Sequence, residues 1–401
     1  MRILFIAGSY WPATGGAQAL IRHVAHGLAR GHEVVVLADR IDDLPTQRLS
    51  ESLRHPPAFS AFDDGPVRVV ALNLSAARRL ALLPLVAQVT PGLRRYAYGR
   101  LRIGMLEFYA RVVAPLCREH VAGADIVHVW AGGFIGAVAL RAGRAAGRPV
   151  VMTPFVHPGQ WGDDLASRRM YRRVDRVVSL LETEAATLRN LGVEAARIAT
   201  CGVCAPSVEL GGGSELRARL AIDGPLVLFL GVRRPYKGYD LLLAAADRVS
   251  AAVPGVCFAF VGPGPALAAE ASHARILDVG MVDDRERGAW LEAADLLCLP
   301  SSNEIFPVSV LEAWSARTAV VLSDLPPLVE LLDRSGGGVA VARAPEPLAD
   351  ALIDLLLRSD KRGRLAEAGH RFWREGHTPD AIAACHEHLY TTLIDEAACA
   401  I

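Results

Sequence analysis

Two glutamates eight residues apart carry the clearest chemical signal in this sequence. Glu304 stands in a turn-rich segment after the apolar run from Leu296 to Pro300, and Glu312 lies in the helical stretch that follows. Pro307 suits the first turn of that helix, where its missing N–H would be unpaired anyway. The exposed backbone amides of such a helix, at the carboxyl edge of a parallel sheet, are suited to a pyrophosphate. We expect Glu312 to accept hydrogen bonds from a ribose diol and Glu304 from hydroxyls of a bound sugar.

The elements that must position these carboxylates follow a repeated order of strand, loop and helix. Arg2 to Gly8 reads as a strand, Ser9 to Gly16 as a loop, Ala17 to Arg30 as a helix and Glu33 to Ala38 as a second strand. This order predicts a right-handed βαβ unit of a doubly wound parallel sheet. Further strands are predicted at 124–129, 149–153 and 176–180, and, after a glycine-rich linker at 201–224, at 225–231, 256–262, 276–280, 296–300 and 319–323.

Length and composition bound the architecture and exclude one class of partner. A chain of 401 residues that is 52% hydrophobic exceeds one ordinary core and predicts two α/β domains with a cleft between them. We place an N-terminal Rossmann-like domain at 1–205, a C-terminal one at 206–375, and at 376–401 a helical tail that packs back toward the first domain. Basic and acidic residues balance at 43 each, so nothing in the charge indicates a nucleic-acid partner.

The spacing of the two glutamates resembles a known family signature. Glu304 and Glu312, within Pro300-Ser301-Ser302-Asn303-Glu304 and Leu311-Glu312-Ala313-Trp314, look like the signature of glycosyltransferase family 4, whose members adopt the GT-B fold and usually retain anomeric configuration. The resemblance covers nearly the whole chain. Its other landmarks stand in order: Gly15-Gly16, Gly31-His32-Glu33-Val34, Thr183-Glu184, Leu188, Gly192-Val193, Leu230-Gly231, Lys237-Gly238, Val261-Gly262-Pro263-Gly264 and Ala294-Asp295.

The resemblance implies a donor site for a nucleotide diphosphate sugar in the C-terminal domain, with the acceptor bound by the N-terminal one. Lys237 and an arginine just before it would hold the diphosphate. The family more often has arginine directly after the glycine, whereas this chain has Val232 and then two arginines, so both remain candidates. The implied donor residues are Gly15, Gly16, Arg233, Arg234, Lys237, Gly262, Gly264, Met281, Val282, Glu304, Phe306, Pro307, Val308 and Glu312.

The family also has a histidine at the edge of a middle strand that faces the reacting sugar. His157 is the candidate here, about two residues later than the commonest spacing. His128 lies within a predicted strand and is interpreted as a packed histidine of the core or the cleft rim. The catalytic residues implied by the resemblance are therefore His157, Glu304 and Lys237.

The implied reaction moves a hexose-type sugar from a donor such as a UDP- or GDP-sugar to an acceptor hydroxyl, with retention and without a cofactor. No Asp-x-Asp triplet occurs, so we expect metal independence. A GT-B phosphorylase, a sugar-nucleotide epimerase and a non-catalytic sugar-nucleotide-binding protein stay open as alternatives, since a fold does not prove an activity. A nicotinamide-dependent oxidoreductase is disfavoured because Gly262-Pro263-Gly264 lacks the third glycine of that fingerprint.

The segment 75–118 is the candidate acceptor or membrane region. Its eight arginines stand against the single acid Glu107 and alternate with leucine and aromatic residues. A surface helical hairpin that packs its apolar side on the domain is the favoured interpretation. Peripheral contact with an anionic membrane or a lipid phosphate is the alternative. The arginines are Arg78, Arg79, Arg94, Arg95, Arg100, Arg102, Arg111 and Arg118.

The cysteines and the apolar segments indicate a cytoplasmic protein. The seven cysteines are scattered, and we expect buried thiols in a reducing compartment. Cys201 and Cys204 have the Cys-x-x-Cys spacing, but no second pair completes a zinc site, so a structural role is favoured over metal or redox chemistry. The run from Ile126 to Leu140 is too short to span a membrane, and the N-terminus lacks the apolar core of a signal peptide.

Overall fold

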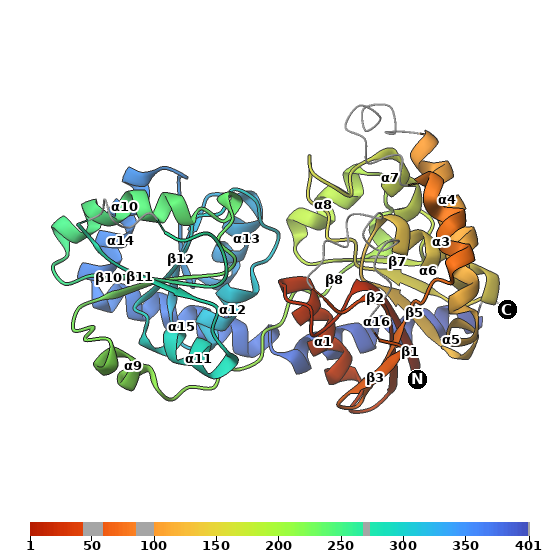
Figure 1. Ribbon diagram of the computed structural model, residues 1–401, viewed down its shortest axis with the longest axis horizontal. Coiled ribbons are helices and arrows are strands. Elements are labelled where there is room, and N and C mark those ends of the chain that lie inside the picture. Colours follow the sequence, from red (N-terminus) through yellow and green to blue (C-terminus); the bar gives the residue numbers. More distant parts are fainter. Residues whose placement is uncertain (43–58, 86–99, 268–272, 400–401) are drawn as a thin grey trace. The chain divides into compact units, whose positions relative to one another are not determined.

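The chain folds into two α/β units, each built on one mainly parallel sheet (Figure 1). The computed structural model describes residues 1–42, 59–85, 100–267 and 273–399. The first unit comprises Met1–Gly202 and Ile382–Ile401, and the second comprises Val203–Ala381. The chain therefore passes between the units twice, after Gly202 and after Ala381, compared with the predicted boundaries at 205 and 375.

The first unit contains an eight-stranded sheet in the order β3-β4-β2-β1-β5-β6-β7-β8. All neighbouring strands are parallel except β3 and β4, which form an antiparallel hairpin at one edge. Strands β1 and β5 are neighbours. The strands that follow β1 in the chain extend the sheet toward one edge, and those that follow β5 extend it toward the other. The strands are β1 (Arg2–Ser9), β2 (Glu33–Arg40), β3 (Ala61–Asp64), β4 (Val67–Ala71), β5 (Ile126–Val129), β6 (Val150–Met152), β7 (Arg176–Ser179) and β8 (Ile198–Thr200).

The helices of the first unit bury apolar faces against this sheet. In α6 (Gly133–Ala146) the buried set includes Ile135, Val138 and Ala139, a helical spacing that turns one side to the core. The remaining helices and 3-10 turns are α1 (Gly16–Leu28), α3 (Ala76–Leu82), α4 (Arg100–Val113), η3 (Ala114–Cys117), α5 (Arg118–Gly123), α7 (Leu165–Tyr171), α8 (Glu182–Asn190), η4 (Ala195–Arg197) and most of α16 (Pro379–Cys399).

The second unit contains a six-stranded parallel sheet in the order β11-β10-β9-β12-β13-β14. Counted along the chain this is the order 3-2-1-4-5-6, the doubly wound arrangement of dinucleotide-binding folds. The strands are nearly continuous apolar runs because both faces are covered, as in Leu226–Leu230, where every residue is buried. They are β9 (Leu226–Leu230), β10 (Cys257–Val261), β11 (Arg275–Gly280), β12 (Leu296–Leu299), β13 (Ala319–Ser323) and β14 (Gly338–Val341).

The helices of the second unit alternate with its strands. They are α9 (Gly213–Arg219), η5 (Pro235–Lys237), α10 (Tyr239–Ala252), α11 (Asp284–Ala293), α12 (Val308–Ser315), α13 (Pro326–Ser335), α14 (Pro345–Leu357) and α15 (Ser359–Gly376). Helix α9 lies inside the segment 201–224 that was predicted to be a linker. Its Leu216 is buried, and Arg217 donates to the carbonyl of Ala293, so this part of the predicted linker belongs to the second unit.

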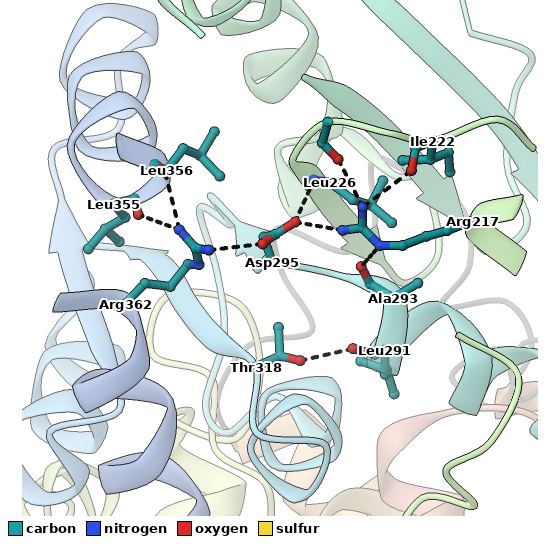
Figure 2. Close-up of polar contacts among 11 residues, drawn as sticks. Arg217, Ile222, Leu226, Leu291, Ala293, Asp295, Thr318, Leu355, Leu356 and Arg362 are labelled. Carbon is teal, nitrogen blue, oxygen red and sulfur yellow. Dashed lines mark hydrogen bonds and ion pairs between the residues drawn. The ribbon is translucent and has the colours of Figure 1, made fainter. Parts of the chain in front are cut away.

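Asp295, a landmark of the family resemblance, organises the amino-terminal edge of the second sheet (Figure 2). Its Oδ2 accepts from Arg217 Nη2 at 2.7 Å and from the backbone N–H of Leu226 at 2.9 Å, and its Oδ1 accepts from Arg362 Nη2 at 3.0 Å. The two guanidinium groups also donate to carbonyls of α11, α14 and the segment before β9. Asp295 therefore joins two helices to two strands, and its role is structural.

The cysteines differ in part from the expectation of separate thiols. Cys201 and Cys385 form a disulfide, which attaches α16 to the segment after β8 within the first unit. The expectation was wrong for this pair because residues separated by 184 positions give no spacing signal in the sequence. The cysteines therefore no longer support the expectation of a reducing compartment, because disulfides are rare there. Cys117, Cys204 and Cys298 are buried thiols whose pKa is raised by burial, as expected.

Candidate functional site

The candidate donor site lies where the second sheet reverses its strand order. Strands β9 and β12 are neighbours there, and the carboxyl edge of a parallel sheet at such a reversal is where ligands bind in folds of this kind. Lys237 comes from η5 after β9, and Glu304 comes from the segment after β12. Lys237 Nζ donates to Glu304 Oε1, and Ser301 Oγ donates to the same oxygen at 3.3 Å. Residues 67 positions apart thus meet at one point of the sheet.

A glycine holds these two segments at backbone contact. Gly238 follows Lys237 with φ of +74°, and a Cβ at this position would overlap the carbonyl oxygen of Pro300 at the end of β12. The backbone N–H of Ser302 donates to the carbonyl of Tyr236 at 2.7 Å, which ties the same segments together. The position of the Lys237 side chain therefore depends on a residue without Cβ.

Loops rich in glycine follow β9 and β10 at the same edge. A Cβ on Gly262 would overlap the carbonyl oxygen of Gly231, and one on Gly264 would overlap Arg233. The backbone N–H of Gly231 donates to the carbonyl of Val261 at 2.9 Å, and that of Arg233 donates to Pro263 at 2.8 Å.

The two arginines after β9 have different environments. The guanidinium of Arg233 is buried, donates to Asp278 of β11, and lies 3.5 Å from the carbonyl of Gly264. Arg234 is exposed. Arg233 therefore joins the glycine loops to β11, and Arg234 is the arginine of the pair that is accessible to a ligand.

Glu312 lies in the first turns of α12 and is buried. Burial raises the pKa of its carboxyl group, an effect that Arg287 opposes and Asp284 adds to. Arg287 Nε lies 3.4 Å from Glu312 Oε1 and Arg287 Nη2 lies 3.1 Å from Asp284 Oδ1. The sequence reasoning missed Arg287 because only the fold brings α11 beside α12.

The segment between Glu304 and α12 differs from the prediction by one position. Pro307 is the residue before the helix and not part of its first turn, since its ψ of 119° is extended and α12 begins at Val308. Phe306 is buried, with its ring centroid 5.4 Å from that of His377. Val308 opens the helix. Of the two predicted residues after β11, Met281 is exposed and Val282 is half-buried.

Of the predicted residues of the first unit, Gly15 and Gly16 follow β1, which is at the strand reversal between β1 and β5. Gly15 has φ of +149° and directly precedes α1, which begins with Gly16. After β5, Gly132 directly precedes α6, which begins with Gly133, and Gly133 has φ of +62°. Both helices thus begin without a side-chain cap, which leaves their first backbone amides to other partners.

His157 lies in a tight turn after β6. Its backbone pairs with Trp161, the two tilted rings lie with centroids 3.8 Å apart, and its Nδ1 lies 3.1 Å from the carbonyl oxygen of Phe155. Phe155 has φ of +52°, an unfavourable conformation for a residue with Cβ that tends to persist at functional sites. His128, in contrast, is fully buried in β5 and is hydrogen-bonded to Thr153 and Tyr390, which confirms its interpretation as a core histidine.

Glu184 supports the turn that carries His157, a role that the sequence reasoning did not assign. Its Oε1 accepts from the backbone N–H of Val156 and its Oε2 from that of Leu180, both at 2.8 Å. Burial raises the pKa of Glu184 to about 7, although the two backbone hydrogen bonds favour the charged form. The family landmark Thr183-Glu184 is the sequence signal that could have indicated this role of Glu184.

The segment 75–118 forms helices where the structure describes it. In α4 the residues Met105, Leu106, Tyr109 and Ala110 are buried and Arg111 is exposed, so this helix packs its apolar side on the domain as favoured. Arg94, Arg95 and the side chain of Arg100 lie outside the described residues. No helix among the described residues is both long and apolar enough to cross a membrane. The same residues contain no group of three metal-ligating side chains.

Two family models match the chain in succession. Residues 15–204 match the model described as glycosyl transferase 4-like domain, and residues 224–358 match glycosyl transferases group 1. A phosphatidyl-myo-inositol mannosyltransferase of Mycolicibacterium smegmatis is 35% identical over 37% of this chain and 42% of its own. A D-inositol 3-phosphate glycosyltransferase of Segniliparus rotundus is 31% identical over 53% of this chain and 52% of its own. The chain thus spans about two fifths to one half of these relatives in the matches.

Solved structures match the fold over nearly the whole chain. The Anabaena protein HepE in complex with UDP has a TM-score of 0.70 at 17% identity, covering 98% of this chain and 100% of its own. Sucrose-phosphate synthase from Thermosynechococcus elongatus has a TM-score of 0.73 at 18% identity, covering 98% and 99%. These likenesses show the two-Rossmann GT-B fold. The chain belongs to the glycosyltransferases of this fold, with a family 4-like domain followed by a group 1 domain.

Proposed function

We propose that the chain transfers a hexose-type sugar from a nucleotide diphosphate sugar to an acceptor hydroxyl, with retention and without a metal ion. The observation that carries the proposal is the meeting of Lys237 and Glu304 at the strand reversal of the second sheet, beside the glycine loops and α12. A cation and main-chain amides at this edge of the sheet suit the diphosphate of such a donor, and a carboxylate suits its sugar hydroxyls.

The leaving diphosphate is the part of the reaction that this site can stabilise. Cleavage of the bond between sugar and phosphate develops negative charge on the diphosphate, and cations fixed at that point lower the barrier. Lys237 and the exposed Arg234 supply the positive charges in this proposal, while Arg233 remains bound to Asp278 as a support. The ion pair of Lys237 with Glu304 opens when phosphate takes the lysine and a sugar hydroxyl takes the carboxylate.

Glu312 is proposed to bind the ribose diol. Its buried carboxylate has Arg287 as a counter-ion, and a charged acceptor is about twice as strong a hydrogen-bond partner as a neutral one. Met281 and Val282 after β11 are proposed to contact the base. The complexes of HepE with UDP and with UDP-glucose make a uridine donor the first to test.

The acceptor is proposed to bind the first unit near Gly15, Gly16 and His157. Names of the relatives suggest inositol phosphates and phosphatidyl-inositol as first acceptors to test, beside other carbohydrates. Metal independence is proposed because the chain has no Asp-x-Asp triplet to chelate a divalent ion on the diphosphate. In this scheme the departing phosphate takes the acceptor proton, with no obligatory protein base.

Calorimetry with nucleotide diphosphates in the presence of EDTA tests the donor site. Lys237→Ala should weaken binding of the preferred nucleotide by about tenfold or more, because a hydrogen bond between charged groups contributes about 1.5–3 kcal/mol. Lys361 is the only other lysine of the chain and pairs with Asp354, so Lys361→Ala is the matched control and should bind as the wild type does. Failure of every nucleotide diphosphate to bind the wild type would overturn the proposal.

Product analysis tests the chemistry. Incubation with the bound sugar nucleotide and an acceptor should give a glycoside of unchanged anomeric configuration, with equal yield in EDTA and in magnesium. An inverted product, or turnover only with metal, would contradict that part of the proposal. Sugar-nucleotide interconversion without any acceptor would identify the epimerase alternative.

A further inference from the structure

Three helices of the first unit enclose a groove that the proposed transfer reaction does not use. Helices α4, α6 and α7 pack against one another (Figure 1), and the groove between them has a volume of about 530 Å³. This volume lies within the roughly 300–1,000 Å³ that is usual for small-molecule sites. All the lining residues belong to one unit and to the described part of the chain.

The floor of the groove is apolar. Leu106 and Ala110 of α4, Leu140 of α6 and Met170 of α7 line it and are buried, with Ile103 and Ala137 half-buried beside them. These side chains are apolar and carry no hydrogen-bond donor, so the floor suits a flexible hydrocarbon chain.

The rim of the groove is strongly basic. Four exposed arginines line it, Arg141 and Arg144 of α6 together with Arg169 and Arg173 of α7 and its end, against the single acid Glu107. Glu107 Oε1 lies 3.8 Å from Arg169 Nη2, a loose and half-exposed pair. Among the described residues, no carboxylate lies within ion-pairing distance of the other three arginines.

The arginines of the rim are held close to one another. Arg144 Nη2 donates to the main-chain carbonyl of Arg173 at 2.9 Å, which fixes its guanidinium beside the second arginine. Partial burial lowers the pKa of Arg173, and the charges of Arg144 and Arg169 lower it further. An anion placed among these three groups would relieve their repulsion and accept several charge-assisted hydrogen bonds.

We propose that this arginine-rimmed groove binds a phosphate-bearing lipid, with the phosphate among Arg144, Arg169 and Arg173 and an acyl chain along the apolar floor. The oxygens of a phosphate ester match the planar fork of a guanidinium group. The hydrocarbon chain of the lipid would bury the apolar floor, which a free phosphate would leave uncovered. The inference is independent of the donor site, which is formed by other residues in the other unit. It assigns the first unit a point of attachment to an anionic membrane.

Co-sedimentation with vesicles tests the proposal on the full chain. The protein should pellet with vesicles of phosphatidylcholine containing 30% phosphatidylglycerol and not with pure phosphatidylcholine, and the binding should fall in high salt as exposed charge contacts are screened. The double variant Arg144→Glu and Arg173→Glu should lose about tenfold or more of its vesicle affinity.

The matched control reverses the same number of charges elsewhere on the first unit. Arg68 of β4 and Arg189 of α8 are exposed, so Arg68→Glu with Arg189→Glu changes the net charge equally without touching the groove. Equal losses in the two double variants would overturn the proposal, because the attraction would then be a property of total charge. Thermal unfolding of each variant verifies that it folds.

A variant that preserves charge tests the apolar floor. Ala137→Trp fills the groove from a half-buried position of α6 and should abolish binding of a short-chain phosphatidic acid measured by calorimetry. Binding of that lipid to the wild type, with no binding of inorganic phosphate at the same concentration, is the result that we expect. Equal binding of lipid and inorganic phosphate, or unchanged lipid binding by Ala137→Trp, would overturn the lipid assignment.

Discussion

At the scale of single residues, the two arginines after β9 show what the fold adds to the sequence. Adjacent residues of the same type have opposite roles, because Arg233 is buried on Asp278 while Arg234 is exposed. Nothing in the sequence separates them, since the difference depends on β11, which lies more than 40 residues further along the chain.

Lys237 is one of only two lysines in a chain whose basic residues are almost all arginines. The chain contains 43 basic residues other than histidine, and only Lys237 and Lys361 among them are lysines. A compact ammonium at this position meets Glu304, whereas a planar guanidinium would need more room. Lysine chemistry is therefore a selective probe of the proposed donor site.

Glu184 gives a prediction on pH. Because its pKa is raised from 4.5 to about 7 in the folded protein, the folded state keeps a proton between these values that the unfolded state releases. The contribution to stability is complete below pH 4.5 and is lost as the pH rises to about 7. The loss is on the order of 3 kcal/mol, at about 1.4 kcal/mol per pKa unit.

Urea unfolding between pH 4.5 and 8 measures this effect. Glu184→Gln should be less stable at low pH and should show a flatter decline between pH 4.5 and 7. Its exposed neighbour Glu182 supplies the control, since Glu182→Gln should keep the decline of the wild type. Equal pH profiles for the wild type and Glu184→Gln would show that Glu184 stays charged.

At the scale of elements, the strand pattern predicted the buried apolar strands well and missed four short strands. Runs of Val, Leu, Ile and Phe indicated β9, β10 and β12, which are buried on both faces. The strands β3, β4, β8 and β14 were not predicted. They are three to five residues long and partly exposed, so they lack the continuous apolar run.

Gly238 connects the fold to the site and gives a second prediction. Gly238→Ala should destabilise the protein by about 1–3 kcal/mol, because a Cβ overlaps the carbonyl of Pro300 and the φ of +74° is unfavourable for alanine. It should also weaken nucleotide binding by displacing Lys237. The control is Gly363→Ala, in the exposed part of α15 where a Cβ has open space. Unchanged stability and binding in Gly238→Ala would show that the two segments separate freely.

The Asp295 cluster in Figure 2 gives a third prediction, this one for stability alone. Asp295→Ala leaves Arg217, Arg362 and the N–H of Leu226 without their acceptor and should cost about 3 kcal/mol, since bonds to charged groups contribute about 1.5–3 kcal/mol each. Asp350→Ala removes an exposed ion pair with Arg248 and should change the stability by less than about 0.5 kcal/mol. Chemical denaturation measures both, and a small effect of Asp295→Ala would contradict the structural role.

At the scale of the whole molecule, the sequence predicted two Rossmann-like units but not how the chain joins them. The resemblance to family 4 rested on short motifs, and several of them, such as Gly15-Gly16, Leu230-Gly231 and Val261-Gly262, fall at a helix start or a strand end. The disulfide between Cys201 and Cys385 lies beside both points where the chain passes between the units. Its formation depends on the path of α16, which no local pattern encodes.

This disulfide gives a fourth prediction. A cross-link that closes 184 residues restricts the unfolded chain and typically stabilises a protein by about 2–4 kcal/mol. A reductant should therefore lower the Tm of the wild type, while the variant Cys201→Ser with Cys385→Ser should start low and show no further change. Cys399→Ser, at an exposed thiol, is the control. A wild type insensitive to reductant, with the bond absent by mass spectrometry, would refute the pairing.

The most direct measurement is lysine footprinting with an amine-selective acylating reagent, followed by peptide mass spectrometry. Lys237 and Lys361 are the only lysine side chains to compare, and Lys361 serves as an internal standard far along the chain. The account predicts that a nucleotide diphosphate, in EDTA, slows acylation of Lys237 about tenfold or more at saturating ligand and leaves Lys361 unchanged. Equal acylation of Lys237 with and without a nucleotide that calorimetry shows to be bound would place the donor elsewhere and contradict the central claim.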